Sequence, residues 1–291
     1  MNKKKYSSQK KIFSFLILFA LASNLSSDIE DNIALHKEQF SEVALKIWEY
    51  AELGYQETKS SNLLASELKK EGFKITKGVA GIPTAFVAEF GSSGPVIGIL
   101  GEFDALPGLA QTNSPFKEVA INDSGGGHAC GHHLFGAASA WAAVSIKEWL
   151  VENDIDGTVR FYGTPAEEGG SGKVYMVREG LFDDVDVVLH WHPDDVNSAN
   201  PKTSNSNKSA KFTFKGISAH AAGSPELGRS ALDGVEAMNM MVNMMREHIP
   251  QESRMHYVIT KGGLAPNVVP DLAEVYYCLL YTSDAADEGS S

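Results

Sequence analysis

Residues 96–108 read VIGILGEFDALPG, and the first half of this stretch decides the fold class. Its six residues are apolar or glycine, which is typical of a short strand buried on both faces of a sheet. Predicted strands and helices alternate on both sides of it. The sequence therefore predicts an α/β domain with a mixed, largely parallel sheet flanked by helices.

The predicted elements fall into two groups, separated by a polar stretch at 194–209. In the first group, strands are predicted at 84–90, 96–101, 158–162 and 185–190, and helices at 31–53, 57–71, 134–151 and 173–179. In the second group, strands are predicted at 211–215, 256–260 and 272–277, and a helix at 229–247. We interpret the groups as one domain at 23–205 and an incomplete α+β domain at 206–278. Residues 279–291 are predicted to be a non-native or disordered tail.

The composition and the N-terminal residues of the chain limit its possible binding partners and its cellular location. The 291 residues carry a formal net charge of -12, which argues against nucleic acid as a partner. Lysines precede an apolar run at 12–22 that ends in Ala-Leu-Ala, a pattern typical of a signal peptide at 1–22. A periplasmic or secreted location is therefore predicted, with an uncleaved membrane anchor as the alternative.

A dense group of metal-binding residue types lies in the stretch GGGHACGHH at 125–133. Cys130 and His132 are two residues apart and can face one cation with the sulfur and nitrogen donors that zinc favours. A glycine-rich loop with incidental histidines is one alternative. A cysteine nucleophile activated by His132 is another, with poor geometry for attack because the two residues are so close in sequence.

The adjacent carboxylates Glu167 and Glu168 follow the strand predicted at 158–162. Because adjacent carboxylates repel each other, one of them is expected to have a raised pKa outside a metal site. With a divalent cation, one carboxylate can bind the cation while the other takes a proton from water. A solvated acidic turn is the alternative.

Other polar residues lie where predicted strands end. His190 and His192 lie at the end of one strand, and Asp104 follows another. Sites in α/β sheets form outside the carboxyl ends of strands, so these side chains are expected to converge. Asp104 is expected either to orient a ligand histidine or to form an Asx turn. In the second domain, His220 and Asn267 are candidates for contact with a substrate.

Several segments in this order resemble the aminoacylase/carboxypeptidase family of co-catalytic metallopeptidases, and within it the amidohydrolase branch. They are GEFDALPG (101–108), GHACGHHLFG (127–136), GTPAEEGGSGK (163–173), LFDDVDVVLHWHP (181–193), FKGISAHAAGSPELGRSALDG (214–234) and GGLAPNVVPDLAEVYY (262–277). The resemblance covers nearly everything between residues 30 and 277. It implies a metallohydrolase catalytic domain followed by a lid, or dimerisation, domain.

The resemblance also implies roles for the candidate residues. The implied metal ligands are Cys130, His132, Glu168 and His192, with His190 as the alternative to His192. Glu167 matches the general base, and His220 matches a histidine that polarises the substrate carbonyl. Asn267 and Arg229 resemble residues that hold the substrate carboxylate. Two divalent cations are implied, with zinc favoured by the cysteine ligand and manganese, cobalt or nickel as alternatives, together with a homodimer formed through the lid.

Two features depart from the family pattern. His133 stands where the family has Asp or Asn. The family also continues beyond residue 280, where it supplies a last histidine ligand, so both domains are expected to be truncated at their C-terminal ends.

We therefore predict a metal-dependent amidohydrolase or metallopeptidase that cleaves an amide bond next to a carboxylate-bearing group. The expected substrates are small N-acyl amino acids, dipeptide-like molecules or aminobenzoyl-glutamate. An inactive fragment, or a non-catalytic protein that dimerises or binds, is the alternative.

Overall fold

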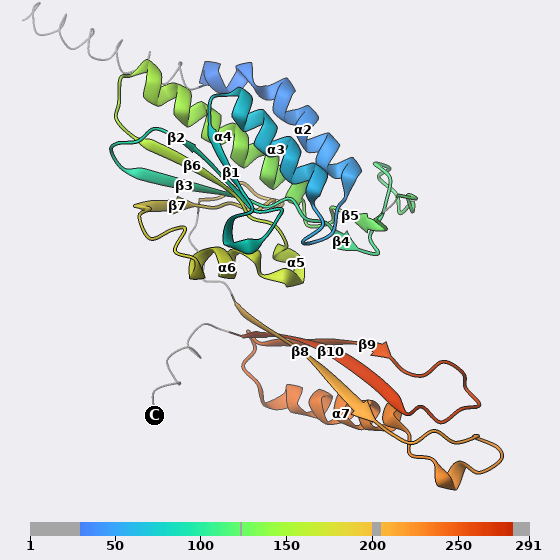
Figure 1. Ribbon diagram of the computed structural model, residues 1–291. Helices are drawn as coiled ribbons and strands as arrows, with labels where there is room; N and C mark the ends of the chain where they lie inside the picture. Colours follow the sequence, from blue (N-terminus) through green and yellow to red (C-terminus); the bar gives the residue numbers. More distant parts are fainter. Residues whose placement is uncertain (1–29, 123, 200–204, 282–291) are drawn as a thin grey trace, which may run out of the picture. The chain divides into compact units, whose positions relative to one another are not determined.

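The computed structural model describes residues 30–122, 124–199 and 205–281, in two compact units, 1–197 and 198–291. The first unit is an α/β domain, and the second contains three strands and a helix (Figure 1). The predicted signal peptide at 1–22 lies outside the described residues.

The first unit contains a five-stranded sheet in the order β1-β2-β6-β3-β7. The strands are β1 (Lys74–Lys77), β2 (Phe86–Phe90), β6 (Thr158–Gly163), β3 (Val96–Gly101) and β7 (Val187–Leu189). β2 pairs antiparallel with both β1 and β6, whereas β3 pairs parallel with both β6 and β7. The predicted α/β class with a mixed sheet is confirmed, and the parallel pairing lies in the β6-β3-β7 half.

The central strands β3 and β6 bury side chains on both faces of the sheet. Their register pairs Ile99 with Phe161 and Leu100 with Tyr162. Successive side chains of a strand point to opposite faces, so the two pairs enter two different cores. Ile99 and Phe161 lie in the larger core, and Leu100 and Tyr162 lie in the smaller one.

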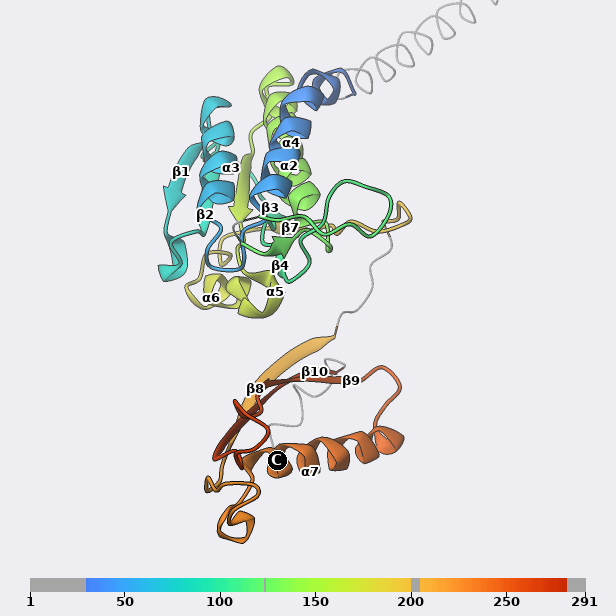
Figure 2. The ribbon, with the colours of Figure 1, turned by 90° about the vertical axis from the view of Figure 1, so that its right-hand side faces the viewer.

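Helices cover the two faces of this sheet unequally. On one face lie α2 (Lys37–Tyr50), α3 (Thr58–Lys70) and α4 (His132–Glu152), and on the other lies α6 (Gly172–Arg178) (Figure 2). The three helices supply the larger core with buried residues such as Phe40, Leu64 and Val144. The shorter α6 supplies Met176 to the smaller core.

Helix α4 packs closely against the end of β3. A Cβ atom on Gly136 of α4 would lie 2.6 Å from the carbonyl oxygen of Glu102, and one on Gly101 would lie 3.5 Å from the Cα of Gly136. Only glycine allows the two backbones to come this close. This contact places His132, the first residue of α4, beside the residues that follow β3.

A short two-stranded sheet holds the glycine-rich stretch in place. Strands β4 (Leu106–Pro107) and β5 (Gly126–Gly127) pair antiparallel, with Leu106 opposite Gly127. This pairing fixes the loop that leads into Cys130 and α4 against the loop that follows β3.

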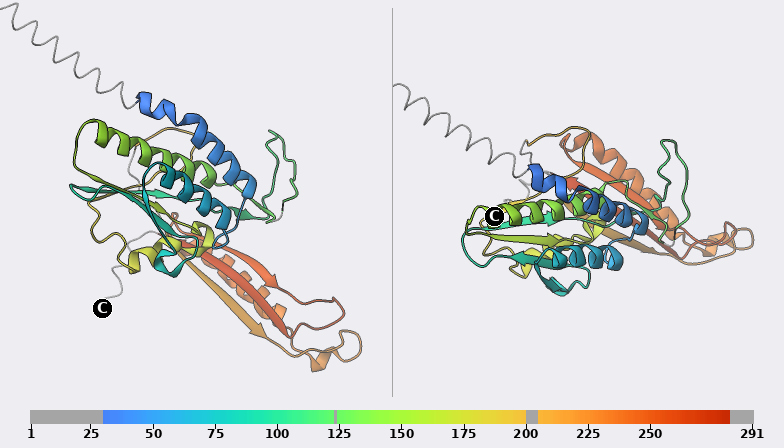
Figure 3. Two further views of the ribbon diagram at one scale, coloured as in Figure 1. Left: turned by 45° about the horizontal axis from the view of Figure 1, so that its top comes forward. Right: turned by 90° about the horizontal axis from the view of Figure 1, so that it is seen from above.

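The second unit is a three-stranded antiparallel sheet with one helix on its face (Figure 3). The strand order is β8 (Ser206–Lys215), β10 (Leu272–Tyr281) and β9 (Arg254–Lys261). The helix is α7 (Ala231–Met245), whose first turn is capped by the Ser230 hydroxyl, which accepts a hydrogen bond from the Asp233 amide. Val235 of α7 packs with Val275 and Tyr277 in the core of this unit.

The predicted tail begins too early. Leu279–Tyr281 continue β10, and Tyr281 pairs with Ser206 at the start of β8. The polar residues 206–209, predicted to belong to a linker, are the partners of this last part of β10. Both errors arise because long-range pairing, rather than local pattern, extends these strands. Residues 282–291 lie outside the described residues.

The predicted periplasmic or secreted location has to be corrected. It depended on the apolar run at 12–22, which lies outside the described residues. Among the described residues, no helix is long and apolar enough to cross a membrane. No feature of the described part of the chain supports export.

Candidate metal centre

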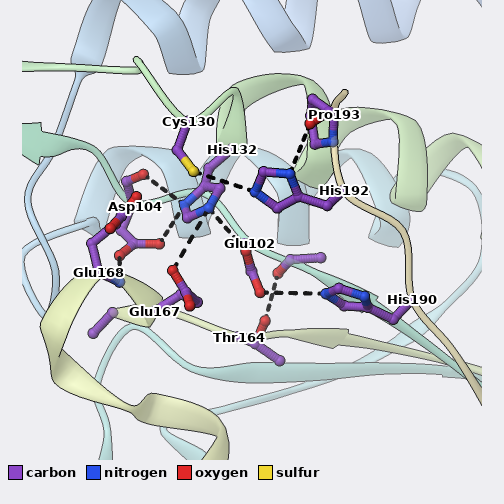
Figure 4. Close-up of polar contacts among 12 residues, drawn as sticks. Glu102, Asp104, Cys130, His132, Thr164, Glu167, Glu168, His190, His192 and Pro193 are labelled. Carbon is purple, nitrogen blue, oxygen red and sulfur yellow. Dashed lines mark hydrogen bonds and ion pairs between the residues drawn. The ribbon is translucent and has the colours of Figure 1, made fainter. Parts of the chain in front are cut away.

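Polar side chains from four segments converge at the carboxyl ends of the parallel strands in the first unit (Figure 4). They are Glu102 and Asp104 after β3, Cys130 and His132 at the start of α4, Glu167 and Glu168 in the turn labelled α5 (Glu167–Gly170), and His190 and His192 after β7. The candidate residues predicted in the first domain are therefore brought together in one place.

His132 lies at the centre of this group, with only 1% of its side chain exposed. Its Nδ1 lies 3.0 Å from Oδ1 and 3.1 Å from the carbonyl oxygen of Asp104. Because both partners are acceptors, Nδ1 carries the proton. In the neutral tautomer the Nε2 lone pair is free, and this atom lies 3.0 Å from Oε2 of Glu102 and 3.9 Å from Oε2 of Glu167.

The charge on His132 is set by the carboxylates around it. Burial alone would lower its pKa, but the hydrogen bond to Asp104 and the close negative charges of Asp104 and Glu102 outweigh burial and raise the pKa to about 10. The buried atoms Nε2 of His132 and Oε2 of Glu102 are close but lack hydrogen-bond geometry. Two buried polar atoms that approach without bonding each other are the pattern expected where both face a cation.

Cys130 and His192 bring further donors to the same place. The Cys130 sulfur lies 3.3 Å from Nε2 of His192. Nδ1 of His192 donates to the carbonyl oxygen of Pro193 at 2.8 Å, which leaves its Nε2 lone pair directed at the centre. The donor atoms of Cys130, His132 and His192 all lie within 4.8 Å of one another.

The two adjacent glutamates differ in environment. The Glu167 side chain is 46% exposed. Glu168 is more enclosed, and its Oε1 is buried without a hydrogen-bond partner. Burial, followed by repulsion from Glu167, raises the pKa of Glu168. The raised pKa expected from the sequence for one member of the pair therefore falls on Glu168.

The same carboxylates act on the Cys130 thiol. Burial, together with the charges of Glu168 and Glu167, raises the pKa of Cys130 to about 12. A thiol in this environment is protonated at neutral pH unless a cation compensates the carboxylates. This opposes the alternative of a cysteine nucleophile activated by His132.

Glu102 and Lys173 were not predicted from the sequence. Glu102 is 2% exposed and forms a close ion pair with the Lys173 ammonium group. Burial would raise the pKa of Glu102, but contacts with His132, His190 and Lys173 lower it well below its usual range. The available signal was its position, since Glu102 directly follows the same apolar strand as Asp104.

His190 and His133 take up positions different from those of His132 and His192. Nε2 of His190 lies 3.7 Å from Oε1 of Glu102, on the side of that carboxylate facing Lys173. His133 packs against His128 with ring centroids 5.1 Å apart. Burial, followed by the nearby charge of His132, lowers the pKa of His133 to about 4.

The segment that carries His192 is anchored on α4. The Trp191 indole donates to the Ser139 hydroxyl at 3.0 Å. Gly131 has a left-handed φ of 80°, and a Cβ atom there would lie 2.9 Å from the Pro193 ring. The loop before α4 and the loop after β7 therefore touch directly at Gly131 and Pro193.

The second unit contains His220, Arg229 and Asn267, whose segments are joined by backbone contacts. The Ala221 amide donates to the Asn267 carbonyl at 3.1 Å, and Arg229 pairs with Ile217. Nδ1 of His220 accepts hydrogen bonds from the amides of Ala222 and Gly223, both at 3.1 Å. The neutral His220 imidazole therefore carries its proton on Nε2, which is available as a donor.

Residues 98–272, more than half of the chain, match the family model described as Peptidase family M20/M25/M40. One of the subunits of the p-aminobenzoyl-glutamate hydrolase of Escherichia coli (strain K12) is 47% identical over 252 residues, which cover 86% of this chain and 52% of that protein. The Xaa-Arg dipeptidase of Mus musculus is 30% identical, over 82% of this chain and 54% of that protein. The chain thus spans about half the length of these curated relatives.

Solved structures share the fold. A dinuclear metal-binding peptidase of the M20 family from Bacillus subtilis aligns with a TM-score of 0.59 and 24% identity, over 88% of this chain and 67% of that one. An aminobenzoyl-glutamate utilization protein from Klebsiella pneumoniae aligns with a TM-score of 0.58 and 18% identity, over 89% and 71%. Matched by the family model over more than half of its length, this chain belongs to peptidase family M20/M25/M40.

Proposed function

We propose that the first unit, which contains most of the catalytic domain predicted at 23–205, holds the metal centre of an amidohydrolase that cleaves an amide bond next to a carboxylate-bearing group. The observation that carries this proposal is the convergence of the Cys130, His132 and His192 donor atoms. The substrate class is supported by relatives named for the hydrolysis of p-aminobenzoyl-glutamate, Xaa-Arg dipeptides and hippurate.

The proposed ligands are Cys130, His132, Glu168 and His192. His192 is preferred to His190 because its Nε2 lies near the Cys130 sulfur, whereas Nε2 of His190 lies nearest to Glu102. Glu168 brings a buried oxygen without a hydrogen-bond partner. Two divalent cations fit the number of carboxylates gathered here. Sulfur and imidazole donors favour zinc, with manganese, cobalt or nickel as alternatives.

Glu167 is the proposed general base. Divalent cations bound at this centre would polarise the amide carbonyl and make a water molecule more acidic. The half-exposed Glu167 carboxylate is the one accessible to that water, since Glu168 is more enclosed. Glu167 would take a proton from water as the water oxygen attacks the amide carbonyl carbon, and would give it to the nitrogen as the C–N bond breaks. Asp104 fixes His132 through Oδ1 and the Glu168 amide through Oδ2, so it positions two ligands at once.

The second unit contains the proposed lid, or dimerisation, domain, which was predicted at 206–278 and which β10 extends to Tyr281. His220, with its proton on Nε2, can donate a hydrogen bond to the substrate carbonyl oxygen as negative charge develops on it. Arg229 and Asn267 are proposed to hold the substrate carboxylate. A homodimer formed through this domain is the proposed assembly.

The proposal is tested by measuring metal content and hydrolysis on the same preparation of the full chain. Metal is measured by mass spectrometry, and hydrolysis with p-aminobenzoyl-glutamate, N-acyl amino acids and dipeptides. The proposal is supported if the parent chain binds metal and hydrolyses a substrate, and if the Cys130→Ala/His132→Ala double variant loses both. Metal binding without hydrolysis favours the second candidate, a non-catalytic protein that binds metal or dimerises. Absence of bound metal in the parent chain contradicts the proposed function and leaves a non-catalytic fragment or a protein that only dimerises.

A further inference from the structure

The turn that carries Glu167 and Glu168 begins with a backbone conformation that is rare for its residue. Ala166 is fully buried and adopts left-handed angles, with φ 55° and ψ 45°. An L-amino acid with a Cβ atom adopts this region only when its surroundings hold it there. The direction in which Glu167 and Glu168 leave the sheet therefore depends on whatever fixes Ala166.

Glu57 is the group that fixes the Ala166 amide. Its side chain is completely buried, and Oε1 accepts a hydrogen bond from the Ala166 amide at 2.8 Å. The other oxygen, Oε2, accepts from the Thr84 hydroxyl at 3.0 Å. Both oxygens are therefore occupied, and the carboxylate has one orientation available. The Ala166 amide has this side-chain acceptor in place of a backbone partner.

Residues next to Glu57 contact the same turn at two further points. A Cβ atom on Gly54 would lie 3.1 Å from the Cα of Ala166, so the two backbones are in contact. The Tyr55 hydroxyl donates to the carbonyl oxygen of Gly170, at the other end of the turn. The segment 54–57 thus contacts both ends of the turn that carries the two glutamates.

This segment is itself tied to the loop after β3. The Ala105 amide donates to the carbonyl oxygen of Glu52 at 2.8 Å, and Leu53 forms a bridge with Ala105. The Asp104 side chain reaches the Glu168 amide from that loop. The turn is therefore held by two side chains, Asp104 and Glu57. The segments that carry these two residues are themselves joined by the backbone contacts of Ala105.

We propose that Glu57 is a positioning residue for the metal centre, which holds Ala166 in its left-handed conformation and thereby sets the places of Glu167 and Glu168. The expected effects on metal binding and hydrolysis rest on the proposed function. The placement of the turn itself follows from the contacts of Glu57 and is measured separately.

A purely structural role for Glu57 is the competing explanation, and the chain offers a matched control. Glu52 lies in the same loop, and its carboxylate accepts hydrogen bonds from the amides of Lys59 and Ser60 at the start of α3. These bonds support the helix rather than the turn. Glu52→Gln should therefore weaken the hydrogen bonds at the start of α3 but leave the contact between Glu57 and the Ala166 amide intact.

The first measurement is backbone amide hydrogen exchange of residues 166–170 in the full chain, followed by mass spectrometry. Glu57→Ala is expected to increase exchange in this segment at least tenfold, while Glu57→Gln, which keeps an acceptor oxygen, restores slow exchange. Glu52→Gln is expected to leave the segment unchanged. Slow exchange in a folded Glu57→Ala variant would overturn the proposal, whether or not the protein binds metal.

The second measurement is zinc affinity by competition with a chelator, together with kcat and KM. Glu57→Ala is expected to weaken zinc binding by about 10- to 100-fold and to lower kcat more than it changes KM. If Glu57→Ala does not fold, Tyr55→Phe replaces it, because Tyr55 is exposed. Removing its bond to Gly170 should accelerate exchange at the end of the turn. Unchanged exchange both in Tyr55→Phe and in a folded Glu57→Leu variant, whose side chain fills the site without an acceptor oxygen, would also overturn the proposal.

Discussion

Oδ1 of Asp104 lies 3.0 Å from Nδ1 of His132, and both side chains are almost completely buried. The other oxygen of the same carboxylate accepts the Glu168 amide at 2.8 Å. One side chain therefore orients a histidine and a glutamate that come from segments far apart in the sequence. A change at Asp104 should consequently affect the metal centre more than the fold.

The Asp104→Asn substitution tests this link. The amide keeps one acceptor oxygen but replaces the other with a donor, so it cannot satisfy both His132 Nδ1 and the Glu168 amide. We expect zinc affinity to fall by about 10- to 100-fold. Affinity is measured by chelator competition, with the exposed Asp156→Asn as the control. An affinity within twofold of the parent protein would contradict the assignment.

Substitutions of Glu167 and Glu168 should distinguish loss of metal binding from loss of hydrolysis. Glu167→Ala is expected to keep bound metal and to lower hydrolysis by more than a hundredfold, because the proposed general base is lost. Glu168→Ala is expected to lose metal together with activity. Metal content and kcat are measured on the same samples. Activity of Glu167→Ala within tenfold of the parent protein would exclude its role as the base.

Protonation of His132 should make the stability of the metal-free protein depend on pH. Burial alone would lower the pKa of His132, but its hydrogen bond to Asp104 and the close charges of Asp104 and Glu102 raise it to about 10, above the ordinary value of 6.5. The resulting stabilisation is complete below pH 6.5 and is lost as the pH rises towards 10. Thermal unfolding of chelator-treated protein between pH 6 and 10 measures this loss. His132→Gln should flatten the profile, whereas the exposed His248→Gln should leave it unchanged, and an equally steep profile in His132→Gln would refute the argument.

His220 should contribute to hydrolysis but not to metal binding. Its Nδ1 accepts two backbone amides, so its Nε2 is a fixed donor. We expect His220→Ala to lower kcat by about 100-fold, the loss typical of one donor to a developing oxyanion, with metal content unchanged. His248→Ala, at an exposed position in the same unit, is the control. Equal kcat values for the two variants would exclude the proposed contact.

The sequence predicts elements well where the local pattern is strong. Strand β3 has the predicted bounds, 96–101, because its apolar residues are buried on both faces. Strand β1 (Lys74–Lys77) was missed, since its polar residues are mostly exposed and only pairing with β2 makes them a strand. The start of β8 was missed for the same reason. Predictions that depend on a distant partner fail where the local sequence carries no signal.

Site prediction has the same limit. Residues of unusual type and spacing, such as Cys130 and His132, could be identified from the sequence alone. Glu102 could have been included, because it directly follows the same strand as Asp104. The support from Glu57 could not be predicted, because its contact with Ala166 joins residues 109 positions apart and depends on a left-handed turn.

The contact between Gly131 and Pro193 has a consequence for any attempt to engineer this protein. Gly131 is restricted twice, by its left-handed φ and by the Pro193 ring that a Cβ atom would strike. Even alanine would push the loop carrying His192 away from Cys130. In a library randomised at residue 131 and selected for metal retention, glycine should dominate the survivors, and rescue of another residue should require a smaller one in place of Pro193.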